Sequence, residues 1–165
     1  MPAIPLKYQL WFYYAALACT AMAAGIHDST FNNFLADTFN LSADARGHLE
    51  FPRELPGFLV VMMTGILCML PLTRVGLVAT LVSSLGLVGV AFSAGSYGFM
   101  IVGMIGMSAG MHLLQPVGAS IVIGLSDEHN RGTRMGQAAA VGTMFTALGT
   151  GLVWLLMDRV APQYK

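Results

Sequence analysis

The chain has 165 residues, of which 56% are hydrophobic and only 10% are charged, and its formal net charge is zero. A soluble domain carries about 25% charged residues, so this composition excludes the polar surface of an ordinary water-soluble fold. The mean hydropathy of +0.69 agrees with a surface that mostly faces lipid, where charges are costly. The neutral total also argues against a nucleic-acid partner.

Charged residues divide the chain into uncharged runs that are long enough to cross a membrane. Residues 8–26 and 55–73 are two such runs, residues 75–126 contain no Asp, Glu, Lys or Arg, and residues 135–157 form the last run. A helix needs about 20 apolar residues to cross the hydrocarbon core, so the run 75–126 predicts two spans with a turn at residues 95–98. We expect an all-α, polytopic membrane protein with five transmembrane helices, near residues 8–34, 46–71, 75–94, 98–124 and 135–157.

Local signals refine the first two helices. Residues 26–35 continue the first helix with one apolar and one polar face, and Ser42 is the expected N-cap of the second. Pro52 and Pro56 predict a bend, which membrane helices tolerate when neighbours re-satisfy the backbone. A signal peptide cleaved after residues 21–23 is the alternative for the N-terminus, although the later spans predict a membrane protein in either case.

The distribution of basic residues sets the expected orientation, because cytoplasmic loops carry an excess of Lys and Arg. A cytoplasmic N-terminus leaves four basic residues inside and three outside, which favours that orientation by a single charge. The inside set is Lys7, Arg74, Arg131 and Arg134, and the outside set is Arg46, Arg159 and Lys165.

Four sequence features, two early and two late in the chain, are considered together. The long first helix leads to a loop ending in Leu41-Ser42, followed by Gly47 early in the second helix. The link between the second and third spans is short and reads Leu-Thr-Arg-Val-Gly over residues 72–76.

The later features are a glycine-rich stretch and a loop. Residues 103–110 contain three glycines and lead to Pro116, and residues 127–136 read Asp-Glu-His-Asn-Arg-Gly-Thr-Arg-Met-Gly. In this order the four features resemble the N-terminal half of a major facilitator superfamily transporter, over nearly the whole chain.

The resemblance implies functional roles for the two short links. The family typically has Gly-x-x-x-Asp-Arg-x-Gly-Arg-Arg after its second helix, of which Arg74 and Gly76 are present here. It therefore implies cytoplasmic gating loops at Arg74 and Gly76 and at Arg131 and Gly132. It also implies about twelve helices in two similar halves, so we expect a partial chain whose C-terminal half is missing. A short protein that dimerises or uses a partner chain is the alternative.

Polar residues within predicted spans are candidates for function, because they are expensive in lipid unless they face protein or water. Asp28 and Asn32 share a face of the first helix and could bind an amine or hydroxyl, or carry a proton. Glu50, Arg53 and Glu54 are spaced i, i+3 and i+4, so they form one charged face that can hold its own ion pair or exchange a proton. The alternatives are side chains at the outer interface for the first pair and a structural salt bridge near the outer rim for the second group.

The fourth and fifth helices carry weaker signals. His112 and Gln115 are three residues apart near the middle of the fourth span and could bind a substrate or relay protons, or could serve packing alone. Thr143, Thr146 and Thr150 form a stripe on the fifth helix, which favours tight helix packing over a cavity role.

No catalytic or metal-binding motif is present. The chain lacks Cys-x-x-Cys, a phosphate loop and His-Glu-x-x-His, and its four histidines are scattered. Cys19 and Cys68 both lie in apolar runs and are interpreted as small hydrophobic residues. We expect no enzyme activity, no metal and no cofactor.

These observations together predict secondary active transport of a small solute by alternating access, with proton coupling as a hypothesis. The expected setting is the bacterial cytoplasmic (inner) membrane, and the expected partners are the lipid bilayer, a small-molecule substrate and protons. Both acids and a base are among the candidates, so the charge of the substrate stays open. The alternative function is a non-transporting membrane scaffold or assembly protein that binds a partner through its charged helix faces.

Overall fold

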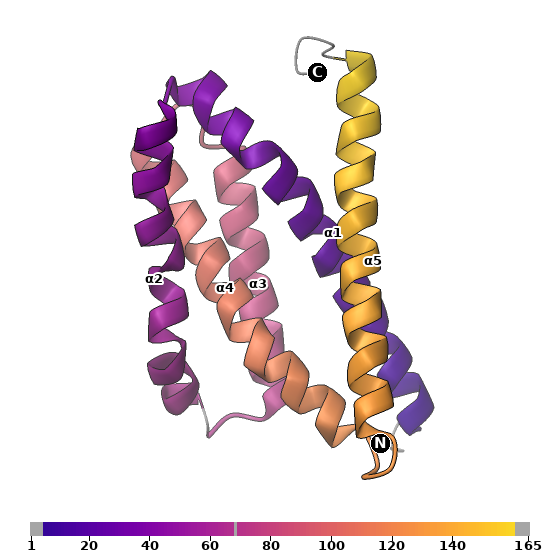
Figure 1. Ribbon diagram of the computed structural model, residues 1–165. Coiled ribbons are helices and arrows are strands. Elements are labelled where there is room, and N and C mark those ends of the chain that lie inside the picture. The colour runs from indigo at the N-terminus through magenta and orange to yellow at the C-terminus, as the bar shows by residue number, and fades with distance from the viewer. Residues whose placement is uncertain (1–4, 68, 161–165) are drawn as a thin grey trace. The chain divides into compact units, whose positions relative to one another are not determined.

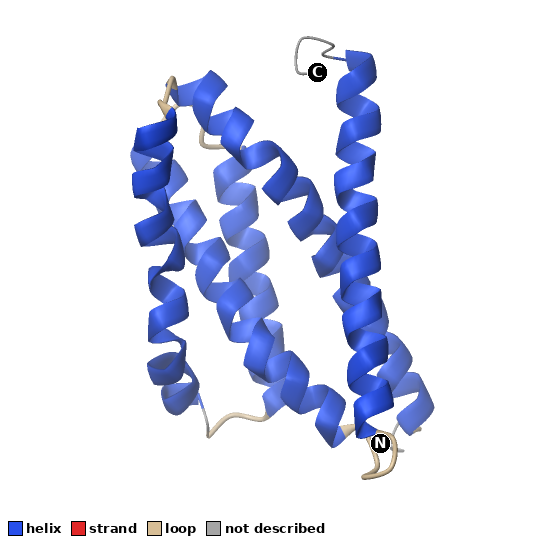
Figure 2. Cartoon of the chain, viewed as in Figure 1, coloured by secondary structure: helices blue, strands red, loops and turns tan. Residues whose placement is uncertain are grey.

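Every regular element of the described chain is an α-helix (Figures 1 and 2). The structure is a computed structural model that describes residues 5–67 and 69–160. The expected all-α class is confirmed, and Cys68 and Lys165 lie outside the described residues. The helices are α1 (Leu6–Phe39), α2 (Ala43–Leu67), α3 (Leu72–Ala91), α4 (Tyr97–Gly124) and α5 (Arg131–Val160).

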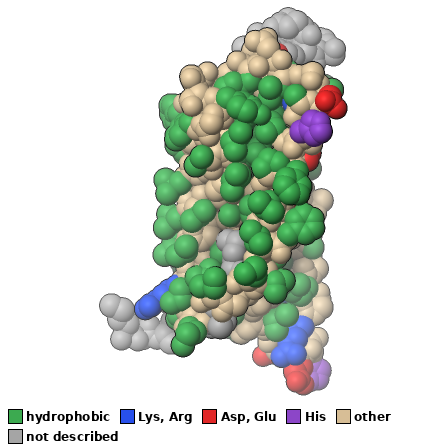
Figure 3. Space-filling view, turned by 90° about the vertical axis from the view of Figure 1, so that its left-hand side faces the viewer, with side chains coloured by type: hydrophobic (Ala, Val, Ile, Leu, Met, Phe, Trp, Pro, Cys, Tyr) green, Lys and Arg blue, Asp and Glu red, His purple; other side chains and the backbone are tan. Residues whose placement is uncertain are grey.

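Four of these helices are long and apolar enough to cross a membrane: α1, α3, α4 and α5. Hydrophobic side chains predominate on the face shown in Figure 3, as lipid contact requires. α2 differs because its first half carries several charged residues and two prolines. The predicted second span is therefore a long helix whose apolar part covers only its second half.

The helix ends follow from local chemistry. α1 continues to Phe39 and stops at Asn40, whose φ of 54° lies in the left-handed region that asparagine tolerates. The hydroxyl of Ser42 accepts a hydrogen bond from the backbone N–H of Ala45 at 3.2 Å, as expected for an N-cap. Pro71 immediately precedes α3, and its missing N–H costs nothing at a helix start.

The helices fall into two compact units, and the boundaries lie inside α1 and α4. The first unit joins the chain up to Asn33 with the chain from Val122 onward, and the second unit is Phe34–Ile121. The single bundle expected from the sequence is therefore described as two units, each with its own packing.

In the first unit, α1 and α5 are in direct backbone contact through glycines. A Cβ atom built at Gly25 would overlap the carbonyl oxygen of Thr146, and one built at Gly149 would overlap that of Met22. The hydroxyl of Thr146 donates to the Ala21 carbonyl at 3.3 Å. Small residues that let helices approach and hydroxyls that bond across the gap are the usual means of packing helices in lipid.

In the second unit, α3 and α4 run antiparallel and also touch through glycines. A Cβ atom at Gly86 would overlap the backbone nitrogen of Met107, and one at Gly103 would lie 2.9 Å from the backbone nitrogen of Val90. A small apolar core also lies between the two helices, formed by Val75, Ala79, Leu113 and Val117. α2 packs against this closely spaced α3–α4 pair.

Candidate functional site

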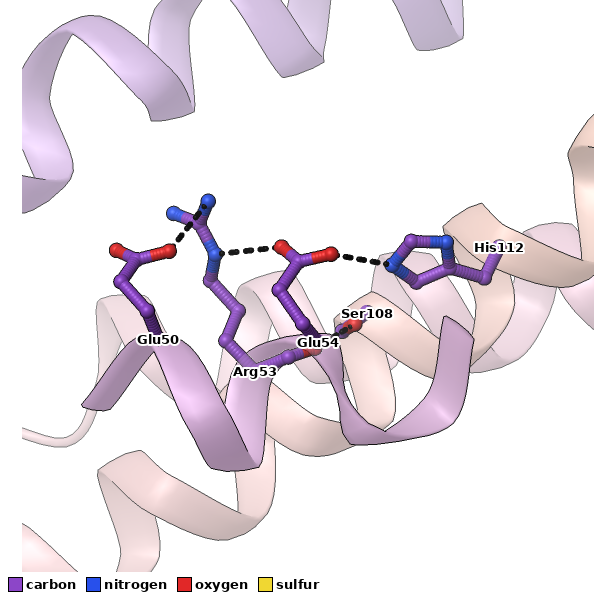
Figure 4. A network of polar contacts seen from close by, with 5 residues as sticks. All are labelled: Glu50, Arg53, Glu54, Ser108 and His112. Carbon is purple, nitrogen blue, oxygen red and sulfur yellow. Dashed lines mark hydrogen bonds and ion pairs between the residues drawn. The ribbon is translucent and has the colours of Figure 1, made fainter. Parts of the chain in front are cut away.

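Four ionisable side chains from α2 and α4 form one continuous chain of contacts in the second unit (Figure 4). The Nη2 atom of Arg53 lies 2.8 Å from Oε2 of Glu50, and its Nε atom lies 3.3 Å from Oε1 of Glu54. The other carboxylate oxygen of Glu54, Oε2, lies 3.3 Å from Nε2 of His112. We call Glu50, Arg53, Glu54 and His112 the charged row.

The spacing of the acids and the arginine on α2 creates most of the row. Residues three and four positions apart share a helix face, so Glu50 lies beside both Arg53 and Glu54. The guanidinium then lies between the two carboxylates and meets each of them through a different nitrogen. This part of the site was predicted from the sequence.

His112 joins the row because α2 and α4 run parallel and lie close together (Figure 1). Gly57 permits the approach, since a Cβ atom at this position would lie only 2.9–3.1 Å from atoms of the imidazole ring. The histidine had been predicted as a candidate, but nothing in its local sequence indicated which acid it would meet.

A second contact holds the same part of α2 against α4. The hydroxyl of Ser108 donates a hydrogen bond to the backbone carbonyl of Arg53, one turn before His112 on α4. Pro56 cannot donate to the preceding turn of α2, and its ring crowds the carbonyls there. A serine from a neighbouring helix is one of the groups that re-satisfy such carbonyls in membrane helices. Sequence reasoning missed Ser108 and Gly57, although the two prolines indicated that a partner for the backbone was needed.

The contact between Glu54 and His112 lies near the middle of both helices. His112 is about 22 Å from the start of α4 and about 18 Å from its end at 1.5 Å per residue. Since the hydrocarbon core is about 30 Å thick, these distances place the imidazole well inside it when α4 spans the bilayer.

The side chains of the row are half-buried. The exposed fraction is 23% for His112, 31% for Arg53, 46% for Glu54 and 48% for Glu50. A sealed structural ion pair would be far less exposed, whereas an exchange site must be reached by a solute or by water. The geometry therefore combines a contact near the middle of both helices with accessible carboxylate and imidazole groups.

The other predicted binding residues are not part of the row. Asp28 and Asn32 lie in the first unit and are exposed, while Gln115 is exposed on α4, one turn beyond His112. The structure therefore brings together Glu50, Arg53, Glu54 and His112, and leaves Asp28, Asn32 and Gln115 as separate candidates.

The residues predicted to lie in gating loops belong to helices. Arg74 and Gly76 lie in the first turns of α3, because α3 already begins at Leu72. Arg131 and Gly132 are the first two residues of α5. The turn before α5 is closed by Asn130, whose Oδ1 accepts a hydrogen bond from the backbone N–H of Asp127 at 2.9 Å.

Three hydroxyl side chains of the first unit, Ser29, Thr146 and Thr150, bond between α1 and α5. The hydroxyls of Ser29 and Thr150 lie 3.1 Å apart, and Thr150 also donates to the carbonyl of Gly25 at 3.4 Å. Thr146 and Thr150 thus behave as the packing interpretation predicted, whereas Thr143 is exposed. Among the described residues, no group of three or more His, Cys, Asp or Glu side chains could hold a metal ion.

Comparison of the chain with protein-family models, curated protein sequences and solved structures finds no match. Function is therefore inferred from the geometry of the charged row and from the composition of the helices around it.

Proposed function

We propose that the chain is part of a secondary active transporter that moves a small solute across the membrane by alternating access, coupled to protons through the charged row. The observation that carries the proposal is the contact between Glu54 and His112 at the middle of two long helices, in a chain with four membrane-crossing candidates. Ionisable side chains at this depth are expensive and typically mark substrate or proton pathways.

The row has the chemistry that proton coupling requires. The carboxylate of Glu54 is shared between a permanently charged guanidinium and an imidazole that carries a charge only when protonated. A proton that binds between Glu54 and His112 strengthens their ion pair, and its loss leaves the carboxylate to Arg53 alone. Proton binding therefore changes the force that holds α2 against α4.

The same contact offers a mechanical link to alternating access. Glu54 and Gly57 flank Pro56, the residue at which α2 is expected to bend, and both contact His112. A change in the strength of the Glu54–His112 contact thus acts directly on the weakest point of α2. Such a contact beside a proline bend is compatible with a bundle of the major facilitator type. In this proposal the bundle lies in the bacterial cytoplasmic membrane with a cytoplasmic N-terminus, and Asp28, Asn32 and Gln115 are available to a solute.

Proton flux in proteoliposomes tests the proposal. The complete transporter that contains this chain is reconstituted with the pH-sensitive dye pyranine inside the vesicles, and organic amines, carboxylates and sugars are added under an imposed pH gradient. We expect a coupled solute to accelerate proton flux in the wild type and Glu54→Gln to abolish the acceleration.

A matched control exists on the same helix. Asp44 and His48 form a second acid–histidine pair at 3.6 Å, but both side chains are more than four-fifths exposed at the start of α2. Asp44→Asn should therefore leave the coupled flux unchanged. Flux that survives Glu54→Gln would sink the coupling role, and the absence of coupled flux with every solute would favour the scaffold alternative.

A further inference from the structure

We infer that the charged row binds a positively charged organic group, of the substituted-ammonium class, in exchange for one proton. This inference rests on the proposed function and adds the charge of the substrate and the stoichiometry of the exchange. It removes anionic solutes from the candidates, a choice that the sequence left open.

The first argument is that the arginine of the row is already occupied. Glu50 and Glu54 meet different nitrogens of the same guanidinium, at 2.8 Å and 3.3 Å. An anionic substrate would have to displace one of these carboxylates, which are held beside the guanidinium on the same helix. The guanidinium would then still face two negative charges, so the exchange gains no electrostatic energy. The imidazole of His112, when it is protonated, likewise faces Glu54, so the row has no vacant cationic group for an anion.

The second argument is the charge balance of the row. Two carboxylates face one guanidinium, so the row carries one negative charge when His112 is neutral and none when the imidazole is protonated. A monovalent cation placed against Glu54 restores neutrality in the same way as the proton. Proton and cation therefore stabilise the same site and compete for it, and one positive charge leaves the site when the other enters.

No other charged group of the second unit disturbs this balance at the middle of the helices. α4 contains no Asp, Glu, Lys or Arg, so His112 is its only titratable residue near the row. Among the described residues of the unit, the remaining charged or titratable side chains lie near helix ends, where solvent screens them: Asp37, Asp44, Arg46, His48, Arg74 and Tyr97.

The third argument concerns the class of cation. Phe51 and Phe58 lie three residues before and four residues after Glu54, so they share its side of α2. Their side chains are 70% and 78% exposed. Aromatic faces on the same side of a helix as a carboxylate can attract an ammonium group through cation–π interaction, while a hydrated metal ion gains much less from them. Together the two rings and the carboxylate favour an organic ammonium group.

The electrostatic part of the inference can be tested without knowledge of the substrate. Both native cysteines, Cys19 and Cys68, are replaced by alanine, and Gln115→Cys introduces a thiol at an exposed position one turn from His112. The full chain is treated with two thiol reagents of similar size, trimethylammonioethyl and sulfonatoethyl methanethiosulfonate. The reaction rate of the introduced thiol with each reagent is divided by the rate of the same reagent with free mercaptoethanol. The ratio of the two normalised rates, cationic over anionic, then cancels the ionisation of the thiol itself.

We expect the cationic reagent to react at least about fivefold faster than the anionic one at alkaline pH, because the row then carries one negative charge. The preference should fall towards unity as the pH is lowered and the row becomes neutral. Glu54→Gln should abolish the preference at alkaline pH and reverse it at acidic pH. His112→Gln should retain the preference at a pH where the wild type has lost it, and Asp44→Asn should behave as the wild type.

A preference for the anionic reagent at alkaline pH, or no reaction with either reagent, would overturn the inference. The second result would mean that water does not reach the site. Neither result depends on a transport assay, so failure here is distinguishable from failure of the proposed transport.

The ammonium class is tested by protection of the same thiol. Phenyltrimethylammonium should slow the reaction, whereas its neutral isostere tert-butylbenzene and the anion benzenesulfonate should not. Phe58→Leu should weaken the protection several-fold by removing one aromatic face. Equal protection by benzenesulfonate, or none by phenyltrimethylammonium at any pH, would refute the assignment of an organic cation.

Discussion

The contact between α3 and α4 makes a sharp prediction, because two glycines three residues apart on α3 meet very different surroundings. A Cβ atom at Gly86 would overlap the backbone nitrogen of Met107 and lie 2.6 Å from the carbonyl oxygen of Gly103. A Cβ atom at Gly89 would lie 3.5 Å from its nearest neighbour, which is ordinary van der Waals contact. Alanine is therefore accommodated at Gly89 and excluded at Gly86.

The expected magnitude follows from the comparison of the two variants. Both gain about 1 kcal/mol in helix propensity, and this gain cancels in their difference. At Gly86 the clashing atoms belong to the backbone and cannot rotate away, so the helices must separate, at an overpacking cost of about 1–3 kcal/mol. We expect Gly86→Ala to be less stable than Gly89→Ala by about that amount, and Gly89→Ala to be no less stable than the wild type.

Reversible unfolding in mixed micelles of dodecylmaltoside and sodium dodecyl sulfate, followed by circular dichroism, measures the free energies of unfolding. Equal stability of Gly86→Ala and Gly89→Ala would refute the inferred backbone contact. A larger loss of unfolding free energy in Gly89→Ala than in Gly86→Ala would mean that α3 and α4 pack in a register different from the one described.

Three further predictions follow from helix contacts. Gly149→Ala should destabilise the α1–α5 pair, because its methyl group would overlap a backbone carbonyl, while Gly151→Ala should not, because nothing lies within 4 Å of its methyl group. The unfolding free energies of the two variants decide this. Ser108→Ala should lower the unfolding free energy by about 0.6–1.7 kcal/mol more than Ser120→Ala, because the Ser108 hydroxyl bonds another helix and the Ser120 hydroxyl bonds only its own. Equal losses would contradict the hydrogen bond between Ser108 and the Arg53 carbonyl. Gly57→Ala should displace the imidazole of the charged row and reduce proton-coupled flux in pyranine-loaded vesicles, and unchanged coupling would show that the contact with the imidazole is not needed.

The helices and their order could be predicted from the sequence, because they depend on local properties. Uncharged runs of sufficient length predict spans, and Ser42 and Asn40 stop or start helices through their own side chains and backbone preferences. The bounds shift by up to five residues, mostly because helices extend beyond their apolar cores. Residues 72–76 were interpreted as the short link between two spans because Arg74 and Gly76 match the loop motif of the family that the chain resembles, whereas Pro71 already starts a helix.

Three of the four residues of the charged row were also brought together by the sequence. The i, i+3 and i+4 spacing alone brings Glu50, Arg53 and Glu54 together on any α-helix. The burial of these side chains and their access to solvent could not be predicted in this way. Both depend on which helix lies beside α2 and on how closely that helix approaches.

Only the tertiary structure decided that His112 meets Glu54, a residue 58 positions earlier. That pairing depends on a glycine that admits the imidazole, on a serine hydroxyl at the proline bend, and on the glycine contacts that hold α4 against α3. Each of these is a long-range contact whose partner has no local signal in the sequence. The physical reason is that helix periodicity determines which residues share a face, whereas close packing between helices determines which faces meet.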